Sequence, residues 1–188
     1  MRVLPLSFFR RPAETVARDL LGATVVSRVG GGRPTAGVVV EVEAYLGRED
    51  PASHAWGGRL NRSNRSLYAA PGTWYVYRSY GIHWCANLVC SPAGGGGAVL
   101  LRALLPTRGL DTLRRRRGGV PVPRIADGPG KLCQAFGITR ELDGLAMPGS
   151  PVLVGENGER PAGSILVTPR IGITRAADWP LRFVLTAA

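Results

Sequence analysis

The stretch that most constrains the fold is residues 38–45, Val-Val-Val-Glu-Val-Glu-Ala-Tyr. Its four valines favour a β-strand, because β-branched side chains pack well on a pleated surface. Successive side chains of a strand point to opposite faces. The alternation predicts one face with Glu41, Glu43 and Tyr45 beside Val39, and an opposite apolar face formed by Val38, Val40, Val42 and Ala44.

The two carboxylates on this apolar strand allow two interpretations. A buried carboxylate needs either a partner or a chemical role, because burying an unpaired charge is costly. Alternatively, the strand lies at the edge of a sheet and both glutamates face water. The local pattern leaves both alternatives open.

A β-hairpin is predicted downstream of this strand. Residues 73–78 and 82–90 are rich in aromatic and β-branched side chains, and the segment 79–81, Ser-Tyr-Gly, separates them. Tyr80 is therefore expected at the tip, where a side chain has little core in which to bury itself. An aromatic side chain in that place either inserts into a partner or folds back on its own hairpin.

The charge of the chain favours an anionic partner. Arg and Lys number 24 against 13 Asp and Glu, which gives a formal net charge of +11. Lys131 is the only lysine, so 24 − 1 = 23 of these cations are arginines. The planar guanidinium binds two phosphate oxygens at once, and a strongly basic chain is attracted to polyanions. A GC-rich genome would explain the choice of Arg over Lys but not the excess of positive charge.

Length and composition favour a single domain, 1–188, which is long enough to bury a sizeable core. The three cysteines are an odd number and indicate a reducing cytoplasm rather than a disulfide framework. No apolar run approaches the roughly 20 residues that span a bilayer, and the N-terminus is too short and too soon charged for a signal peptide. We expect a cytoplasmic monomer with no membrane partner, associated with the nucleoid in a bacterial cell.

The remaining segments predict an α+β fold. Helices are expected at 12–21, 111–117 and 131–136, and further strands at 23–29, 98–105, 152–154, 165–168 and 181–185. Asp50 and Pro51 are expected to cap a short helix that carries His54. This irregular order differs from a repeated strand–helix–strand series. We expect a curved, mostly antiparallel sheet with a protruding β-hairpin and peripheral short helices.

A metal site is one alternative for the chemistry. His83, Cys85 and Cys90 lie close together in sequence, but no second pair of ligands accompanies them. The cysteines sit in apolar strands, where packing accounts for them. We therefore expect neither a metal nor another cofactor.

Blocks of sequence spread in order along nearly the whole chain carry a family resemblance. They are Glu-Val-Glu-Ala-Tyr-Leu-Gly at 41–47, Glu-Asp-Pro-Ala-Ser-His at 49–54, Pro-Gly-Thr-Trp-Tyr-Val-Tyr at 71–77, Tyr80-Gly81, Asn87, Leu-Leu-Arg-Ala-Leu at 100–104, Gly-Pro-Gly-Lys-Leu-Cys-Gln-Ala at 128–135 and Pro-Leu-Arg-Phe at 180–183. In identity and order these blocks resemble the alkyladenine DNA glycosylase family, also called 3-methyladenine or methylpurine DNA glycosylases.

The resemblance implies a catalytic group of three residues. Glu43 would be the general base that activates a water molecule. Arg102 and the backbone carbonyl of Ile171 would help to hold that water. Arg102 lies in an apolar run and needs an anionic partner; a protein carboxylate and a DNA phosphate are the alternatives, and the resemblance favours the phosphate.

The resemblance also implies how a damaged base would be held outside the duplex. Tyr45 would stack on one face of the flipped base, and His54 and Tyr77 on the other. Asn87 would press on the purine edge where guanine carries its amino group. Tyr80 would intercalate in the place of the extruded nucleotide.

The function implied is that of a base-excision repair DNA glycosylase. It would flip alkylated or deaminated purines (3-methyladenine, 7-methylguanine, ethenoadenine, hypoxanthine) from double-stranded DNA and hydrolyse the N-glycosidic bond, leaving an abasic site. Strand cleavage is not expected, because Lys131 is the sole side-chain amine for a Schiff base and is remote in sequence from the catalytic strand. The alternative is a non-catalytic basic module that binds the DNA minor groove or RNA and uses Tyr80 to bend the duplex. That alternative does not account for Glu43.

Overall fold

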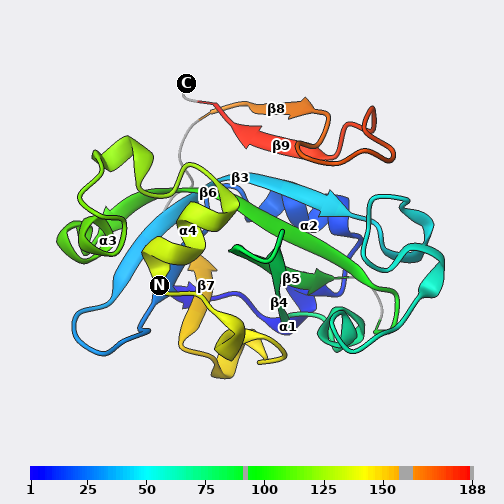
Figure 1. Cartoon of the computed structure of the whole chain (residues 1–188), viewed down its shortest axis with the longest axis horizontal. Coiled ribbons are helices and arrows are strands. Elements are labelled where there is room, and N and C mark those ends of the chain that lie inside the picture. Colours follow the sequence, from blue (N-terminus) through cyan, green and yellow to red (C-terminus); the bar gives the residue numbers. More distant parts are fainter. Residues whose placement is uncertain (91–92, 157–162, 187–188) are drawn as a thin grey trace.

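The strand predicted at 38–45 lies inside β3, Thr35–Tyr45, at the centre of the sheet. The structure is a computed structural model that describes residues 1–90, 93–156 and 163–186. In these residues a curved sheet of nine strands has the order β1-β7-β2-β3-β6-β5-β4, with β9 paired to β3 and β8 to β9, and every pairing is antiparallel (Figure 1). The other strands are β1 Arg2–Val3, β2 Thr24–Ser27, β4 Trp74–Ser79, β5 His83–Cys90, β6 Gly97–Arg108, β7 Val152–Glu156, β8 Ile165–Thr168 and β9 Arg182–Leu185.

The end of β3 that carries the two glutamates is not a sheet edge. Between Glu41 and Glu43, β3 pairs with β6 on one side and with β9 on the other. The edge-strand alternative is therefore wrong, and both carboxylates must find partners inside the protein.

Two irregularities in the pairing of β3 with β6 decide which way the side chains face. Val39 pairs with Leu104 and Glu41 with Ala103, so Val40 is an extra residue on β3. Glu41 pairs with Ala103 and the next residue, Val42, pairs with Leu101, so Arg102 is an extra residue on β6. Such a β-bulge re-aims the side chains around it.

The predicted division of β3 into two faces is therefore partly wrong. Glu41, Glu43 and Tyr45 do share a face, but the extra residue turns Val39 to the core side. The core includes Val39, Val42 and Ala44, whereas Val38 and Val40 are only half-buried.

The helices are short and lie against the sheet. They are α1 Leu6–Phe9, α2 Ala13–Leu20, α3 Leu110–Arg116 and α4 Pro129–Phe136, together with the 3-10 turns η1 Gly47–Glu49, η2 Trp56–Gly58, η3 Arg65–Tyr68, η4 Val122–Arg124, η5 Arg140–Leu142 and η6 Met147–Gly149. In Figure 1, α2 lies behind β3 and β6, and α4 lies in front. No helix of the described residues is both long and apolar enough to cross a bilayer. The predicted α+β fold with a curved sheet and peripheral short helices is confirmed.

Helix α2 follows its sequence signals. Pro12 precedes the first turn, Glu14 lies in that turn, and Gly22 adopts a left-handed conformation (φ 82°) just after the helix. Its buried side chains, Ala13, Val16, Ala17 and Leu20, join the main core.

The predicted hairpin is formed by β4 and β5, which pair up to Ser79 and His83. Tyr80 follows the last paired residue of β4, is 87% exposed and has a positive φ of 49°. The side chain does not fold back on its hairpin, so Tyr80 presents an aromatic ring to solvent.

The prediction that a short helix carries His54 is wrong. His54 lies on a turn between η1 and η2. The Asp50 carboxylate does accept backbone N–H groups, from Leu46 (3.1 Å) and Ala52 (3.0 Å), but it is fully buried and paired with Arg170. The local turn therefore depends on an ion pair with a distant segment rather than on a helix cap.

Candidate active site

A cavity of about 490 Å³ brings together seven of the eight residues predicted for the site. It opens between β3, β6, the β4–β5 hairpin and the segment 171–173. The seven residues that line it are Tyr45, His54, Tyr77, Tyr80, Asn87, Arg102 and Ile171. The eighth, Glu43, lies behind this wall.

Glu43 is fully buried and surrounded by hydrogen-bond donors. Its Oε1 accepts a hydrogen bond from the backbone N–H of Ile171 (2.8 Å) and lies 3.2 Å from Nη1 of Arg102. Its Oε2 accepts from the hydroxyl of Tyr45 (2.9 Å). All three donor residues line the cavity, so the carboxylate is one residue away from whatever occupies it.

Arg102 bridges the two glutamates of β3. Its Nε donates to Oε1 of Glu41 (2.9 Å), and the same oxygen accepts from Nε of Arg182 on β9 (2.6 Å). Burial alone would lower the pKa of Arg102, but the negative charges of Glu43 and Glu41 outweigh it and raise that pKa. Of the two expected partners for Arg102, the structure has the protein carboxylate.

The sequence assigned no role to Glu41, and the structure gives it one. The carboxylate of Glu41 holds both Arg102 and Arg182, and thereby ties β3 to its two neighbours. The sequence signal that pointed to Glu41 was the strand face it shares with Glu43. Its two arginine partners lie 61 and 141 residues away along the chain, so a local pattern could not reveal them.

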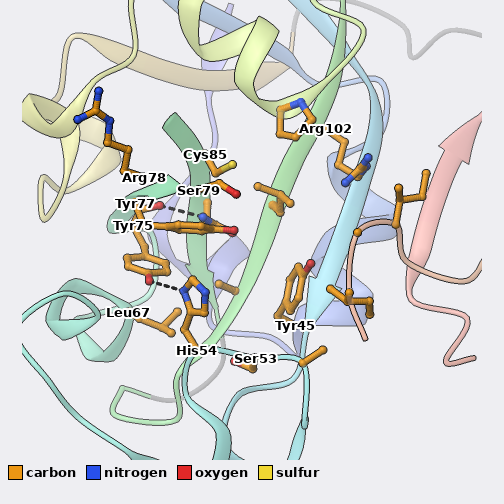
Figure 2. A pocket seen from close by; sticks show the side chains of 18 of the residues that line it. Tyr45, Ser53, His54, Leu67, Tyr75, Tyr77, Arg78, Ser79, Cys85 and Arg102 are labelled. Carbon is orange, nitrogen blue, oxygen red and sulfur yellow. Dashed lines mark hydrogen bonds between the residues drawn. The ribbon is translucent and has the colours of Figure 1, made fainter. Parts of the chain in front are cut away.

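The aromatic side chains stand on opposite sides of the cavity. In Figure 2, Tyr45 lies across the open space from His54 and Tyr77. The His54 and Tyr77 rings meet edge to face with centroids 4.5 Å apart, and Tyr77 stacks on Tyr75 at 5.4 Å. Burial, followed by the charge of Glu43, raises the pKa of Tyr45, so its hydroxyl stays protonated and donates. The gap is bounded by flat rings on both sides.

The ring of His54 is held by a residue that sequence reasoning did not assign to the site. Nδ1 of His54 lies 2.7 Å from the hydroxyl of Tyr75, and burial lowers the pKa of His54, which favours the neutral ring. The backbone of His54 is fixed by Asn64, whose amide donates to its carbonyl (2.8 Å). Alternation along β4 places Tyr75 on the same face as Tyr77, which is the sequence signal that could have found it.

Asn87 is anchored to the hairpin. It is 3% exposed, and its Nδ2 donates to the backbone carbonyl of Tyr75 (3.0 Å) on the paired strand β4. The amide is therefore fixed in place at the wall of the cavity.

Arg170 is a further residue that the sequence did not reveal. It is buried, pairs with both oxygens of Asp50 and donates to the carbonyl of Ala44 (3.1 Å). Its guanidinium carbon lies 4.7 Å from the centroid of the Tyr45 ring. Arg170 thus stands next to the site without lining the cavity.

Of the three cysteines, Cys85 lines the cavity and the other two do not. Cys85, Cys90 and Cys133 are free and buried, and burial raises the pKa of each thiol. In residues 1–90, 93–156 and 163–186, no three His, Cys, Asp or Glu side chains are grouped so as to hold a metal ion.

Comparison with known proteins gives a consistent result. A family model described as methylpurine-DNA glycosylase matches residues 7–188. A protein of Agrobacterium fabrum is 50% identical over 182 residues, covering 97% of this chain and 88% of the relative. Proteins of Methanoculleus marisnigri and Rhodopseudomonas palustris are each 48% identical, with 97% of this chain and 94% and 86% of the relative covered. All three are provisionally named 3-methyladenine DNA glycosylases.

Proposed function

The chain belongs to the methylpurine-DNA glycosylase family and is a DNA glycosylase, and from this premise we propose that it hydrolyses the N-glycosidic bond of alkylated purines in double-stranded DNA, leaving an abasic site. The observation that carries the proposal is Glu43, a fully buried carboxylate held by three residues of an aromatic-walled cavity. A module that only binds DNA has no use for a negative charge beside a polyanion.

The proposed chemistry is a hydrolysis with Glu43 as general base. The bond from C1′ of the sugar to the purine nitrogen breaks, and its electron pair leaves with the purine. The oxygen of water forms the new bond to C1′, and the proton of the water passes to Glu43. Because a purine methylated at N3 or N7 carries a positive charge before cleavage, it leaves as a neutral base and needs little help from an acid.

Arg102 and Ile171 support this role of Glu43. Both donate toward Oε1 of the carboxylate and both line the cavity. We propose that the reactive water is held among these three residues, with the backbone carbonyl of Ile171 as an acceptor. The negative charge of Glu43 also stabilises the cationic sugar that develops in the transition state.

In the proposal, the flipped base binds between the aromatic rings on opposite sides of the cavity. A purine that enters the cavity stacks on Tyr45 with one face and on His54 and Tyr77 with the other, at about 1–3 kcal/mol per stacked base. A positively charged methylated base gains more from such rings than a neutral one, since the ring face is electron-rich. Asn87 presses on the purine edge where guanine carries its amino group and so disfavours normal guanine, whereas the positive charge of 7-methylguanine offsets this cost against the rings.

Tyr80 performs the intercalation. Extruding a nucleotide costs a few kcal/mol in unstacking and unpairing, least for a damaged base. The exposed ring at the tip of the hairpin fills the space left in the duplex and so opposes the return of the base. The net charge of +11 supplies the salt-dependent attraction to phosphates that precedes this step.

The substrate range of the proposal comprises 3-methyladenine, 7-methylguanine and ethenoadenine and, beyond alkylated purines, the deaminated purine hypoxanthine. Ethenoadenine and hypoxanthine are neutral before cleavage, so their departing bases take up a proton from solvent water. The protein acts as a monomer in the cytoplasm, and in a bacterial cell at the nucleoid. The experiment that tests the function is release of free 3-methyladenine from methylated duplex DNA by the wild type, with Glu43→Gln as the paired variant. No release by the wild type would refute the proposal.

A further inference from the structure

Arg170 is a buried cation with three anchors outside the cavity. Its side chain and that of Asp50 are both fully buried in their ion pair. Its Nη2 donates to Oδ1 of Asp50 (2.9 Å) and its Nη1 to the carbonyl of Ala44 (3.1 Å). These contacts fasten the segment around residue 170 to the end of β3 and to the turn at Asp50.

Arg170 reaches the reactive groups by two separate routes. The first is its guanidinium, which lies 4.7 Å from the centroid of Tyr45, a ring that itself lines the cavity. The second is the peptide bond to Ile171, whose N–H donates to Oε1 of Glu43 (2.8 Å). Anchoring the side chain of Arg170 therefore fixes both a stacking surface and a donor to the carboxylate.

We infer that Arg170 is a positioning residue for base removal, which holds the Tyr45 ring from behind and keeps the Ile171 N–H on Glu43. The inference rests on the proposed function. Asp50 and the carbonyl of Ala44 hold the guanidinium of Arg170 in place. The guanidinium in turn packs on Tyr45, and the backbone of Arg170 carries Ile171. A purely structural role, in which the ion pair only fastens residues 165–185 to the sheet, predicts a loss of stability and no loss of rate.

The test compares Arg170→Met with Arg170→Lys and with a matched control. Arg170→Met keeps an apolar stem of similar length but removes the paired guanidinium. Arg170→Lys keeps a cation with a single donor nitrogen in place of the planar fork, and should recover part of the rate. The control is Arg116→Met: Arg116, on α3, likewise ties backbone carbonyls together, those of Val29 and Ala135, but lies outside the site.

The measurements are the single-turnover rate of 3-methyladenine release at saturating enzyme and the dissociation constant for the lesion duplex, both per folded molecule. Arg170→Met should lose about 10²-fold in rate, because a misplacement of about 1 Å costs that much, while its dissociation constant stays near that of the wild type. Arg116→Met should melt earlier and release the base at the rate of the wild type.

A second variant covers the case in which Arg170→Met does not fold. The double variant Arg170→Met/Asp50→Asn leaves no unpaired charge in the interior, which is the main cause of such instability. It should fold and show the same loss of rate. Wild-type rates in the folded Arg170 variants would overturn this inference alone, whereas a wild type that releases no methylated purine would overturn the proposed function as well.

Discussion

Arg102 and Glu43 lie on neighbouring strands with Nη1 3.2 Å from Oε1, and Arg102 is two residues from Leu100, the pairing partner of Glu43. In a regular ladder, pairing residues alternate strictly between faces. Alternation along β6 therefore points Arg102 to the same side as Glu41 and Glu43, and the extra residue at this point keeps both Leu101 and Leu104 in the core. The site thus places a cation inside an apolar strand without disrupting the packing beneath it.

Replacing Glu43 with Gln should nearly stop base release. The amide keeps the size of the side chain but cannot take a proton from water, and loss of a general base costs about 10²–10⁴-fold. Binding to lesion duplex should hold or tighten, because a negative charge near phosphates is removed. Single-turnover assays at saturating enzyme separate the two effects.

The matched control for that change is Glu49→Gln. Glu49 is an exposed carboxylate in η1, close in sequence and outside the cavity lining. It should excise at the rate of the wild type. Glu41→Gln should be intermediate, since Glu41 holds Arg102. Near-normal excision by Glu43→Gln would mean that another group activates the water.

Replacing Arg102 with Gln should reduce both stability and rate. The change leaves Glu43, which is fully buried, and Glu41 beside each other without the cation between them. Removing one partner of a buried pair costs about 3–5 kcal/mol of unfolding free energy, and the lower end applies here because Arg102 and Glu41 retain some exposure. The fall in excision rate should exceed the fall in duplex affinity, since the variant keeps most of the net positive charge that attracts phosphates.

Urea unfolding and single-turnover assays of Arg102→Gln measure the two effects independently. A large drop in stability together with normal excision per folded molecule would show that Arg102 serves the fold alone.

Replacing Tyr80 with Ala should weaken binding to lesion duplex far more than binding to a lesion-bearing single strand, because only the duplex has a gap to fill. The melting temperature should hardly change, since Tyr80 is 87% exposed. Titrations with the two DNA forms measure the difference. Leu60→Ala, at an apolar side chain that is 64% exposed outside the cavity lining, is the control and should leave both affinities unchanged. Equal losses on both substrates would exclude the intercalation.

The stability of the protein should fall in mild acid partly through His54. Burial lowers the pKa of His54 in the folded state below the roughly 6.5 of an unfolded histidine. The unfolded chain then binds more protons, so the contribution of neutral His54 is fully present above about pH 6.5 and is lost as the pH falls through the folded-state pKa. The effect is small, because the residue is partly open to solvent.

Melting temperatures of the wild type and His54→Gln between about pH 8 and pH 5 check this sign. The wild type should lose more stability than the variant over that range. If the melting temperatures of the wild type and His54→Gln fell equally over this pH range, protonation of His54 would not be linked to folding.

Strand cleavage should be absent. The only side-chain amine, Nζ of Lys131, is bound to Oδ1 of Asp127 at 2.9 Å, and Lys131 does not line the cavity. An ammonium held by a carboxylate is a poor nucleophile for a Schiff base. Incubation with lesion DNA and borohydride should give no covalent adduct, and the product should be an intact strand with an abasic site. An adduct that disappears in Lys131→Ala would contradict this.

The sequence was most informative where structure depends on neighbouring residues. The strand at β3, the hairpin with Tyr80 at its tip and the helix after Pro12 follow from residue preferences within a few positions. Glu43 and Tyr45 were found on one face for the same reason. The roles given to these residues came from the family resemblance, and they remain proposals.

Features that depend on distant contacts could not be predicted from the sequence. The extra residues Val40 and Arg102 leave no mark in a local pattern, and they reversed the expected side of Val39. Arg170 meets Asp50 across 120 residues of chain, so the buried pair was missed and Asp50 was taken for the cap of a helix. Tyr75 was overlooked because one tyrosine among several on a strand has no distinguishing signal.

The contact between Ile171 and Glu43 spans 128 residues, so it forms only after strands β1 to β8 have been synthesised. A ribosome produces Glu43, Arg102 and the hairpin well before it produces β9, Arg170 and Ile171. Until those residues emerge, the carboxylate lacks its backbone donor and β3 lacks one of its neighbours at Glu41–Glu43. A nascent chain can therefore hold the aromatic rings of the cavity before the carboxylate of Glu43 has all its partners, because one of these partners belongs to a segment synthesised well after the rings.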